Sequence, residues 1–357
     1  LSFHRLGVGS GSTSIFTPHK HVGPSWPHFG MPRRLFLLSA EVRVAVWVAA
    51  LLSRPPHVGA VGALSRTLVR QGAAPAPAED GDPLSCTVEV LRRLPHASEP
   101  FTQGLEFTAA GQLVESSGDF PQGIGSFVRL ADPRTGLETR RTSDGLRDTS
   151  GSAHSYFVEG ITEMNGHWFA STYTDRVVLE YDENFGYLRS HPFPYEGWGL
   201  THSADGRSLL ATNSTEYLMT VDPATFQVVS ARAVTCLGKR VRGLNELEMV
   251  PDFLGRGPAL LGNVINTRLA LAVDPATARC SAVFHLAGGG LERERESERW
   301  GYHVANGIAY SRQRGTFFVT GKNWRSLFEV RISAEPGQTS ALFVLRQHLS
   351  SASPSPF

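Results

Sequence analysis

The chain has 357 residues, with 34 lysines and arginines against 33 aspartates and glutamates, so its net charge is only +1. That balance gives no reason to expect nucleic acid or an anionic surface as a partner. With 41% hydrophobic and 19% charged residues, the chain can bury a sizeable core, which excludes disorder for most of its length. Its 36 glycines and 22 prolines against four methionines are typical of a turn-rich protein and not of a helical bundle.

The first 63 residues are predicted to be a leader that contains a signal peptide. A basic start follows Met31, the apolar run Val44–Leu52 comes next, and small residues follow at 59–63. This order is typical of a secretory signal, and a run of nine apolar residues is too short to span about 30 Å of bilayer as a helix. We therefore expect a protein of the secretory pathway or the extracellular space without a stable membrane span. The alternative is a membrane anchor formed by residues 35–52.

The folded part is predicted to begin after a linker. Residues 64–82 are rich in proline and alanine and bury too little apolar surface to fold. A single domain is predicted over residues 83–350, with an exposed charged insertion at about 287–300 and a tail over 351–357.

A short β-rich run that ends in a turn recurs along this domain. Its copies end at Asp132, Asp182, Asp222 and Asp274, and a degenerate fifth copy ends near Ser333, so the repeat length is about 40 to 60 residues. Aspartate caps its own backbone two residues further on, which is turn chemistry. A unit of this length has room for four short strands, as in a propeller blade. The repeat therefore predicts an all-β fold, a five-bladed β-propeller.

The ends of the domain are predicted to close the ring, through pairing of strands Cys86–Leu91 and Ala341–Arg346 in one blade. The cysteines Cys86, Cys236 and Cys280 have no zinc-site spacing, and their odd number leaves at least one thiol unpaired. Their pairing stays open from the sequence, with Cys236–Cys280 as one candidate.

Common catalytic signatures do not occur in this domain: HExxH, GxSxG and the P-loop are missing, and the histidines have no ligand spacing. Instead, each repeat carries one or two strings that place a polar or aromatic residue beside glycine near a strand end. These strings are Phe101-Thr-Gln-Gly-Leu105, Phe157-Val-Glu-Gly-Ile-Thr162, Glu196-Gly-Trp-Gly-Leu-Thr-His202, Leu244-Asn-Glu-Leu-Glu248, Asn306-Gly-Ile-Ala309 and Val319-Thr-Gly-Lys-Asn-Trp324. In a propeller, side chains at such positions in successive blades meet at the mouth of the central channel.

In these strings the sequence resembles the plant-type glutaminyl cyclases, or glutaminyl-peptide cyclotransferases. The resemblance covers roughly residues 95–332, and the strings occur in the order found in that family. It implies a five-bladed propeller and an aminoacyltransferase that converts the N-terminal glutamine of peptides and proteins to pyroglutamate with release of ammonia. It also implies catalysis without a metal ion or another cofactor. We expect a monomer whose partners are its peptide or protein substrates.

Carried over position by position, the resemblance implies Glu159 as the catalytic general acid and base, with Lys322 and Asn245 as further catalytic residues. The residues implied to bind the substrate are Phe101, Gln103, Phe157, Tyr173 and Trp198. The family pattern has tryptophan at two positions where this chain has Tyr173 and Ile265. Tyrosine keeps an aromatic wall, whereas isoleucine removes one and alters the size and peptide preference of the pocket.

The chemistry explains why such residues are needed. The α-amine must attack its own γ-carboxamide, so the enzyme chiefly holds the folded-back conformer and moves protons. A partly desolvated Glu159 has a raised pKa and can take the proton of an amine whose own pKa is about 7.7 to 8.0. It can then pass a proton to the leaving nitrogen. Lys322, Asn245 and Gln103 are donors that can polarise the amide oxygen.

Two other functions fit the same strings. One is a non-catalytic propeller that binds peptides or proteins through this face, with a pocket eroded at Ile265. The other is a metal-dependent, lactonase-like hydrolase, for which Glu159, Asn245 and Asn306 are the candidate ligands. Taken singly, Trp198 also fits a core position, and Lys322 fits a solvated strand end.

Overall fold

The structure, a computed structural model of the chain, describes residues 82–351 with gaps at 98–99, 120–124, 144–145, 147–154, 289, 292–293, 295–303 and 335–339. The predicted leader, nearly all of the linker and most of the tail therefore lie outside the described residues. No helix in the described part is long and apolar enough to cross a membrane.

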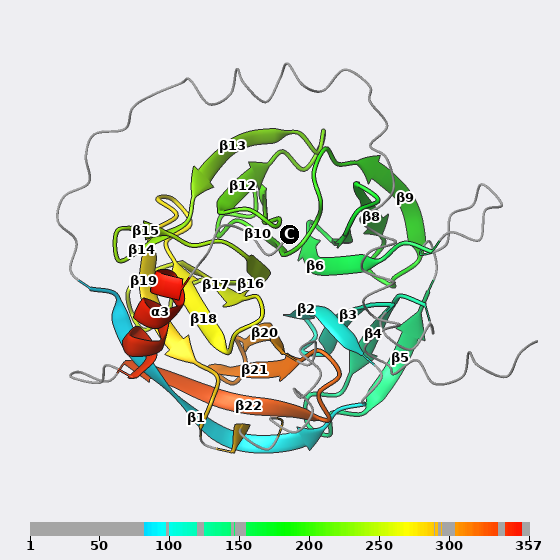
Figure 1. The fold of residues 1–357 in the computed structure, drawn as a ribbon. Helices are drawn as coiled ribbons and strands as arrows, with labels where there is room; N and C mark the ends of the chain where they lie inside the picture. Colours follow the sequence, from blue (N-terminus) through cyan, green and yellow to red (C-terminus); the bar gives the residue numbers. More distant parts are fainter. Residues whose placement is uncertain are drawn as a thin grey trace, which may run out of the picture. The chain divides into compact units, whose positions relative to one another are not determined.

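The described residues form five blades of four antiparallel strands each, arranged as a ring (Figure 1), and the last two blades belong to one eight-stranded sheet. The first blade consists of β2 (Phe101–Phe107), β3 (Leu113–Gly118), β4 (Phe127–Ala131) and β5 (Glu138–Thr142). The second consists of β6 (Val158–Met164), β7 (His167–Thr172), β8 (Val177–Tyr181) and β9 (Tyr187–Pro192). The third consists of β10 (Leu200–His202), β11 (Leu209–Ala211), β12 (Tyr217–Val221) and β13 (Val228–Ala233). The fourth blade consists of β16 (Leu244–Val250), β17 (Ala259–Val264), β18 (Leu269–Val273) and β19 (Cys280–His285). The fifth consists of β20 (Ala305–Ser311), β21 (Thr316–Gly321), β22 (Ser326–Ala334) and β1 (Leu84–Pro95). A short ribbon of β14 (Thr235–Cys236) and β15 (Lys239–Arg240) follows the third sheet. The predicted five-bladed propeller is confirmed.

The innermost strands β2, β6, β10, β16 and β20 surround the centre of the ring (Figure 1). We call the end of the ring where these strands begin the first end, and the end where they finish the second end. Apolar side chains fill the space between neighbouring blades. For example, Val128 and Leu130 of the first blade share one buried cluster with Ile161 and Leu179 of the second.

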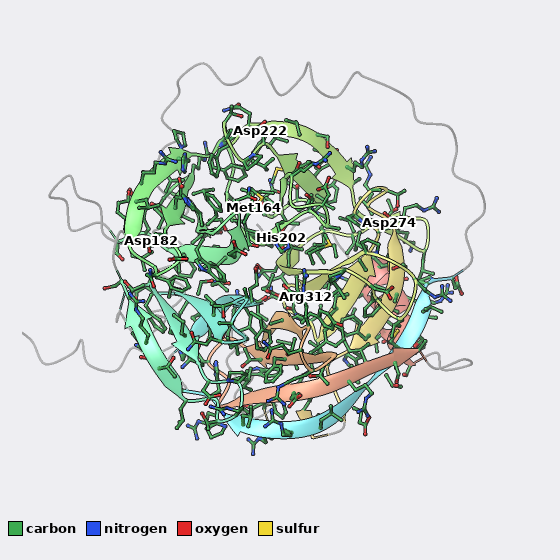
Figure 2. All side chains as sticks on the ribbon, turned by 180° about the vertical axis from the view of Figure 1, so that it is seen from behind. Met164, Asp182, His202, Asp222, Asp274 and Arg312 are labelled. Carbon is green, nitrogen blue, oxygen red and sulfur yellow. A yellow bond between two sulfur atoms is a disulfide. The ribbon has the colours of Figure 1, made fainter. Side chains whose placement is uncertain are left out.

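The aspartates of the sequence repeat make the predicted turns. In the first four blades each joins the third strand to the fourth, and its Oδ1 accepts a hydrogen bond from the backbone N–H two residues on. The distances are 2.8 Å at Asp132, 2.8 Å at Asp182, 2.9 Å at Asp222 and 2.7 Å at Asp274. Three of these turns lie around the outer part of the ring in Figure 2. The spacing therefore identified the blades through a real structural element.

The ring closes through a different pair of strands from the predicted one. β1 pairs antiparallel with β22, from Cys86↔Ala334 to Pro95↔Ser326, and so supplies the outermost strand of the fifth blade. Ser333, predicted as the fifth turn, lies inside β22. The fifth blade needs no turn at this point because its fourth strand comes from the other end of the domain. β1 also pairs in parallel with β19, which joins the last two blades into one continuous sheet.

The predicted strand Ala341–Arg346 is part of helix α3 (Ser340–Ser351) instead. Ala341, Leu342 and Leu345 are buried and lie on one face of this helix, as the helical period requires. They pack with residues of the third and fourth blades. The predicted insertion at about 287–300 is not simply exposed. Beyond its glycine-rich start the structure describes two of its residues, Leu291 and Glu294, and both are buried.

Cys236 and Cys280 form a disulfide, and Cys86 is free and buried. The bridge links β14 to β19 across a sequence separation of 44 residues. We expect its loss to lower the free energy of unfolding by about 2 to 4 kcal/mol, because the open chain gains conformational freedom. Urea unfolding with and without reductant measures this for the wild type and for the double variant Cys236→Ser, Cys280→Ser. Reductant should lower the urea midpoint of the wild type and leave that of the variant unchanged. If the two proteins had the same urea midpoint without reductant, the prediction would be wrong.

Candidate active site

All eight predicted site residues lie at the first end of the ring. They occupy the starts of inner strands (Phe101, Gln103, Glu159, Asn245), the segments just before inner strands (Phe157, Trp198) or the residue after a second strand (Tyr173, Lys322). The antiparallel order brings these positions together, because a second strand finishes where the first strand of its sheet begins.

Three aromatic side chains form a continuous wall. The rings of Phe101 and Phe157 meet edge to face with centroids 6.2 Å apart, and those of Phe157 and Tyr173 meet at 6.1 Å. The Nζ of Lys322 lies 4.8 Å from the centroid of the Phe101 ring, close enough for a cation–π contact. Blades one, two and five thus each contribute to one surface.

Glu159 and Lys322 are the two buried titratable side chains of this site. Glu159 is 5% exposed and Lys322 is 7% exposed. Burial raises the pKa of Glu159 to about 8, with the charge of Lys322 opposing and that of Glu196 adding to the shift. Burial likewise lowers the pKa of Lys322, against the charge of Glu159. A carboxyl with this pKa can both accept and donate a proton near neutral pH.

A second carboxylate, Glu196, belongs to the same site. Its charge raises the pKa of Tyr173, after burial as the first cause and ahead of the charge of Glu159. Glu196 is half-buried, and within the described ranges no hydrogen bond or ion pair engages its carboxylate. The sequence placed Glu196 in one of the strings without giving it a role.

Amide side chains line the inner strands next to the carboxyls. The Nδ2 of Asn306 donates to the Thr102 carbonyl at 2.8 Å and to Oε1 of Gln103 at 3.4 Å. Asn245 is buried, and its Oδ1 has no hydrogen-bond partner among the described residues. A buried acceptor without a partner is costly unless a ligand supplies a donor, so Asn245 is available to bind a substrate N–H group.

Trp198 is almost fully buried and lies beside Ile265. A Cβ added to Gly243 would contact the Cγ2 of Ile265 and, at 4.0 Å, the ring of Trp198. The Ile265 backbone N–H donates to the Gly243 carbonyl at 2.9 Å. The side chains of Ile265 and Trp198 therefore both lie near Gly243, and Ile265 stands at the position where the family pattern has a second tryptophan.

The glycines of the strings allow the blades to approach closely. The Gly160 N–H donates to the Trp198 carbonyl at 2.8 Å, and a Cβ on Gly160 would come within 2.7 Å of that same oxygen. A Cβ on Gly199 would overlap the Asn245 carbonyl. These contacts explain why the polar and aromatic residues stand beside glycine in the sequence.

A buried ionic network supports the segment that carries Lys322. Glu115 accepts hydrogen bonds from Nε of Arg129 and Oγ1 of Thr102, both at 2.6 Å, and its oxygens lie 3.1 Å from Nε2 of His96. The Nδ1 of His96 lies 2.7 Å from the Trp324 carbonyl. Sequence reasoning missed this network. Its signal is a charged residue in the middle of β3, a strand with every residue buried.

A second group of titratable side chains lies at the second end of the inner strands. Figure 2 shows His202 and Arg312 near the centre of that end. Glu106 accepts a hydrogen bond from the Glu163 N–H at 3.1 Å. Glu248 accepts one from the Tyr310 N–H at 2.7 Å. These carboxyls join neighbouring blades, which is a structural role. Within the described ranges, no three histidine, cysteine or carboxylate residues are grouped so that they could hold a metal ion.

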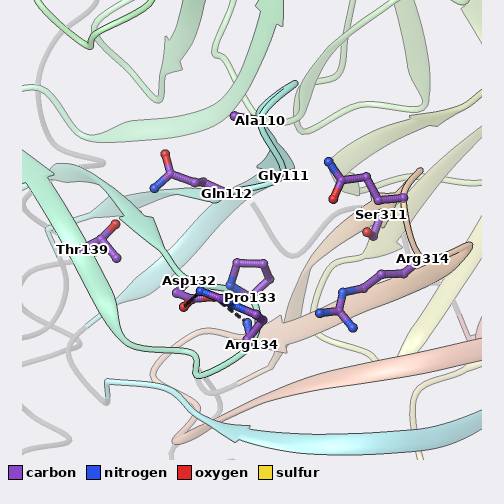
Figure 3. A pocket seen from close by; sticks show the side chains of 10 residues that line it. Ala110, Gly111, Gln112, Asp132, Pro133, Arg134, Thr139, Ser311 and Arg314 are labelled. Carbon is purple, nitrogen blue, oxygen red and sulfur yellow. Dashed lines mark hydrogen bonds and ion pairs between the residues drawn. The ribbon is translucent and has the colours of Figure 1, made fainter.

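A cavity of about 450 Å³ lies away from these residues, between the first and fifth blades. Figure 3 shows its lining, which includes Asp132, Arg134 and Arg314. It is formed by the β2–β3, β4–β5 and β20–β21 turns, and therefore opens at the second end of the ring. Arg134 pairs with Asp132, and Arg314 lies 3.6 Å from Glu329. None of the predicted site residues lines it.

Comparisons with known proteins point to one family. The sequence profile of the glutamine cyclotransferase family matches residues 63–332. The chain is similar to a glutaminyl-peptide cyclotransferase of Arabidopsis thaliana, with 29% identity over 250 residues that cover 69% of this chain and 71% of that protein. It is also similar to the crystal structure of Myxococcus xanthus glutaminyl cyclase, with a TM-score of 0.60 and 25% identity. That match covers 71% of this chain and 100% of the bacterial chain.

Proposed function

The chain belongs to the glutamine cyclotransferase family, and on that premise we propose how it acts as a glutaminyl-peptide cyclotransferase. Glu159 moves the protons that convert an N-terminal glutamine to pyroglutamate and ammonia, and no metal ion takes part. The observation that supports this most is the buried Glu159 carboxyl beside Lys322, at the meeting point of the blades.

The raised pKa of Glu159, about 8, matches that of the substrate amine, about 7.7 to 8.0. The ammonium group can therefore pass a proton to the Glu159 carboxylate at little cost, which leaves a neutral amine and a carboxylic acid. The amine nitrogen then bonds to the γ-carbonyl carbon, Glu159 protonates the departing nitrogen, and the carboxylate takes the second proton of the attacking nitrogen. The carbon–nitrogen bond of the carboxamide breaks, and ammonia leaves.

The other side chains hold the substrate and its developing charge. Lys322 is positioned to stabilise the oxygen that becomes negative during the attack. Asn245 offers an acceptor to a substrate N–H group, because its Oδ1 has no partner among the described residues. The wall of Phe101, Phe157 and Tyr173 packs the methylene groups of the folded-back glutamine and keeps water from Glu159.

The proton inventory predicts a bell-shaped dependence of kcat/KM on pH with a maximum near pH 8. The reaction needs one proton shared between Glu159 and the amine, so the rate falls below pH 8, where both are protonated, and above pH 8, where neither is. We expect kcat/KM at pH 6 to be at least about tenfold below its maximum. Initial rates of ammonia release from pH 5.5 to 10 measure this, and a profile that rises without a maximum would contradict it.

Ammonia release from a peptide with N-terminal glutamine tests the function itself. The full chain is incubated with the peptide, and release is followed with a coupled assay in the presence and absence of a chelator. Release that the chelator leaves unchanged supports the proposal. Binding without release supports the alternative of a non-catalytic peptide-binding propeller, and release that the chelator abolishes contradicts the metal-free mechanism.

We also infer that the enzyme is a monomer of the secretory pathway or the extracellular space. The order of basic, apolar and small residues after Met31 supports export. The Cys236–Cys280 disulfide supports an oxidising compartment, because such bridges are rare in the cytosol. One ring contributes all the site residues, which favours a monomer, and light scattering that gives the mass of two chains would contradict it.

A further inference from the structure

We propose that Glu196 binds the α-ammonium group of the incoming peptide and makes the enzyme selective for free N-termini. This inference rests on the proposed function and extends it. It assigns a role to a carboxylate for which neither the resemblance nor the comparisons give one.

Backbone hydrogen bonds hold Glu196 at the level of the catalytic carboxyl. The N–H of the next residue, Gly197, donates to the Tyr173 carbonyl at 3.2 Å. The carbonyl of Trp198 accepts the N–H of Gly160 at 2.8 Å. The two residues that follow Glu196 are therefore held against Tyr173, which follows β7, and against Gly160, the residue after Glu159.

Glu196 is close enough to these two side chains for its charge to raise the pKa of the Glu159 carboxyl and the pKa of the Tyr173 hydroxyl, in addition to burial, which is the larger cause. Glu159 lies in β6, and Tyr173 directly follows β7. Glu196 is half-buried, and its carboxylate has no cationic or hydrogen-bonding partner within the described ranges. Lys322, the cation of the site, acts on Glu159. A partly desolvated carboxylate without a partner is suited to a cation that the ligand brings.

The substrate brings one such cation. Its α-amine is largely protonated at neutral pH, and Glu159 is too deeply buried to hold a lasting negative charge against that ammonium group. Glu196 is half-buried and lies closer to solvent than Glu159, so it can attract the ammonium while Glu159 takes the proton. Two carboxyls in different environments thus have different roles.

The attraction between Glu196 and the substrate ammonium group would also favour product release, because the product no longer has that charge. The lactam nitrogen of pyroglutamate carries no charge, so the attraction to Glu196 disappears once the ring has closed. Peptides whose N-terminus is acetylated lack the charge from the start. Glu196 therefore discriminates a free N-terminus from both the blocked peptide and the product.

The variant Glu196→Gln tests the inference because it keeps the shape of the side chain and removes its charge. We expect KM for the glutaminyl peptide to rise about tenfold or more, as for the loss of a hydrogen bond to a charged group. The inhibition constant of the pyroglutamyl product should stay within about twofold, because the product has no ammonium group. The control is Glu183→Gln, an exposed residue of the β8–β9 turn at the second end, which removes the same charge from the protein and should leave KM unchanged.

A binding measurement keeps the test independent of turnover. In a Glu159→Gln background, calorimetry compares the dissociation constants of the glutaminyl peptide and its N-acetyl form, with and without Glu196→Gln. The free-amine peptide should lose about tenfold in affinity and the acetylated peptide almost nothing. Equal losses for both peptides, or an unchanged KM, would overturn the role of Glu196. Absence of ammonia release from the wild type would instead overturn the proposed function and leave this binding comparison interpretable.

Discussion

Glu159→Gln is expected to keep the folded ring and to lower kcat by at least about a hundredfold. Glutamine has nearly the same shape as glutamate, so the packing around this buried side chain is preserved. It cannot take the proton of the substrate amine or return one to the leaving nitrogen. Because that loss falls on the chemical step, kcat and kcat/KM should decrease together. The rate of ammonia release at saturating peptide measures the effect.

The matched control for this variant is Glu163→Gln on the same strand. Glu163 lies at the second end of β6, where its Oε1 accepts the Gly166 N–H at 2.6 Å. Glutamine can keep that hydrogen bond, so kcat should stay within about twofold of the wild type. A Glu159→Gln variant with nearly full activity would remove Glu159 from its assigned role.

The same substitution has an expected effect on stability. Since burial raises the pKa of Glu159 to about 8, the folded state favours the protonated carboxyl. The corresponding stability is present below the unfolded pKa of about 4.3 and is lost as the pH rises through 8. Glu159→Gln removes this loss, and the variant should therefore be more stable than the wild type above about pH 8. A function that needs a buried carboxyl thus reduces stability at alkaline pH.

The fold was predictable wherever local chemistry repeats. Asp132, Asp182, Asp222 and Asp274 each cap a turn within two residues, so the blades could be counted without knowledge of the strand pairs. The closure was not predictable in the same way, because β1 and β22 lie more than two hundred residues apart and no local residue specifies their register. The apolar run Ala341–Arg346 is short enough to fit a strand or a helix. Its burial against two blades decides for the helix.

The site was predictable to the extent that its residues stand in unusual strings beside glycine. The close approach of Gly160 and Gly199 to neighbouring backbone gives those strings their physical reason. Glu196 stood in a string, but its relation to Tyr173 depends on a backbone hydrogen bond from Gly197 to Tyr173 that only the structure provides. The network around Glu115 stood in no string, since its members come from separate strands and each resembles an ordinary polar residue.

The network around Glu115 leads to the second large effect, because it holds the guanidinium group of Arg129 inside the protein. Both ring nitrogens of His96 face acceptors, the Trp324 carbonyl at 2.7 Å and the Glu115 carboxylate at 3.1 Å. Arg129, whose Nε donates to Glu115 at 2.6 Å, is a buried cation in the same network. Burial alone would raise the pKa of Glu115, but the charges and hydrogen bonds of Arg129, His96 and Thr102 hold it well below its usual range.

Glu115→Gln is therefore expected to lower the free energy of unfolding at neutral pH by about 3 to 5 kcal/mol, because it leaves the buried Arg129 guanidinium without its main counter-charge. The carboxylate with a lowered pKa contributes stability above its unfolded pKa of about 4.3 and loses it as the pH falls. The difference in the free energy of unfolding between wild type and variant should therefore shrink in acid.

The control is Glu138→Gln. Glu138 lies 3.8 Å from the same Arg129 but is more exposed, so its substitution should lower the free energy of unfolding by less than about 1 kcal/mol. Urea unfolding at pH 7 and pH 4 measures both variants. Equal losses for both, or a difference that grows in acid, would show that Glu115 does not stabilise the buried charge of Arg129.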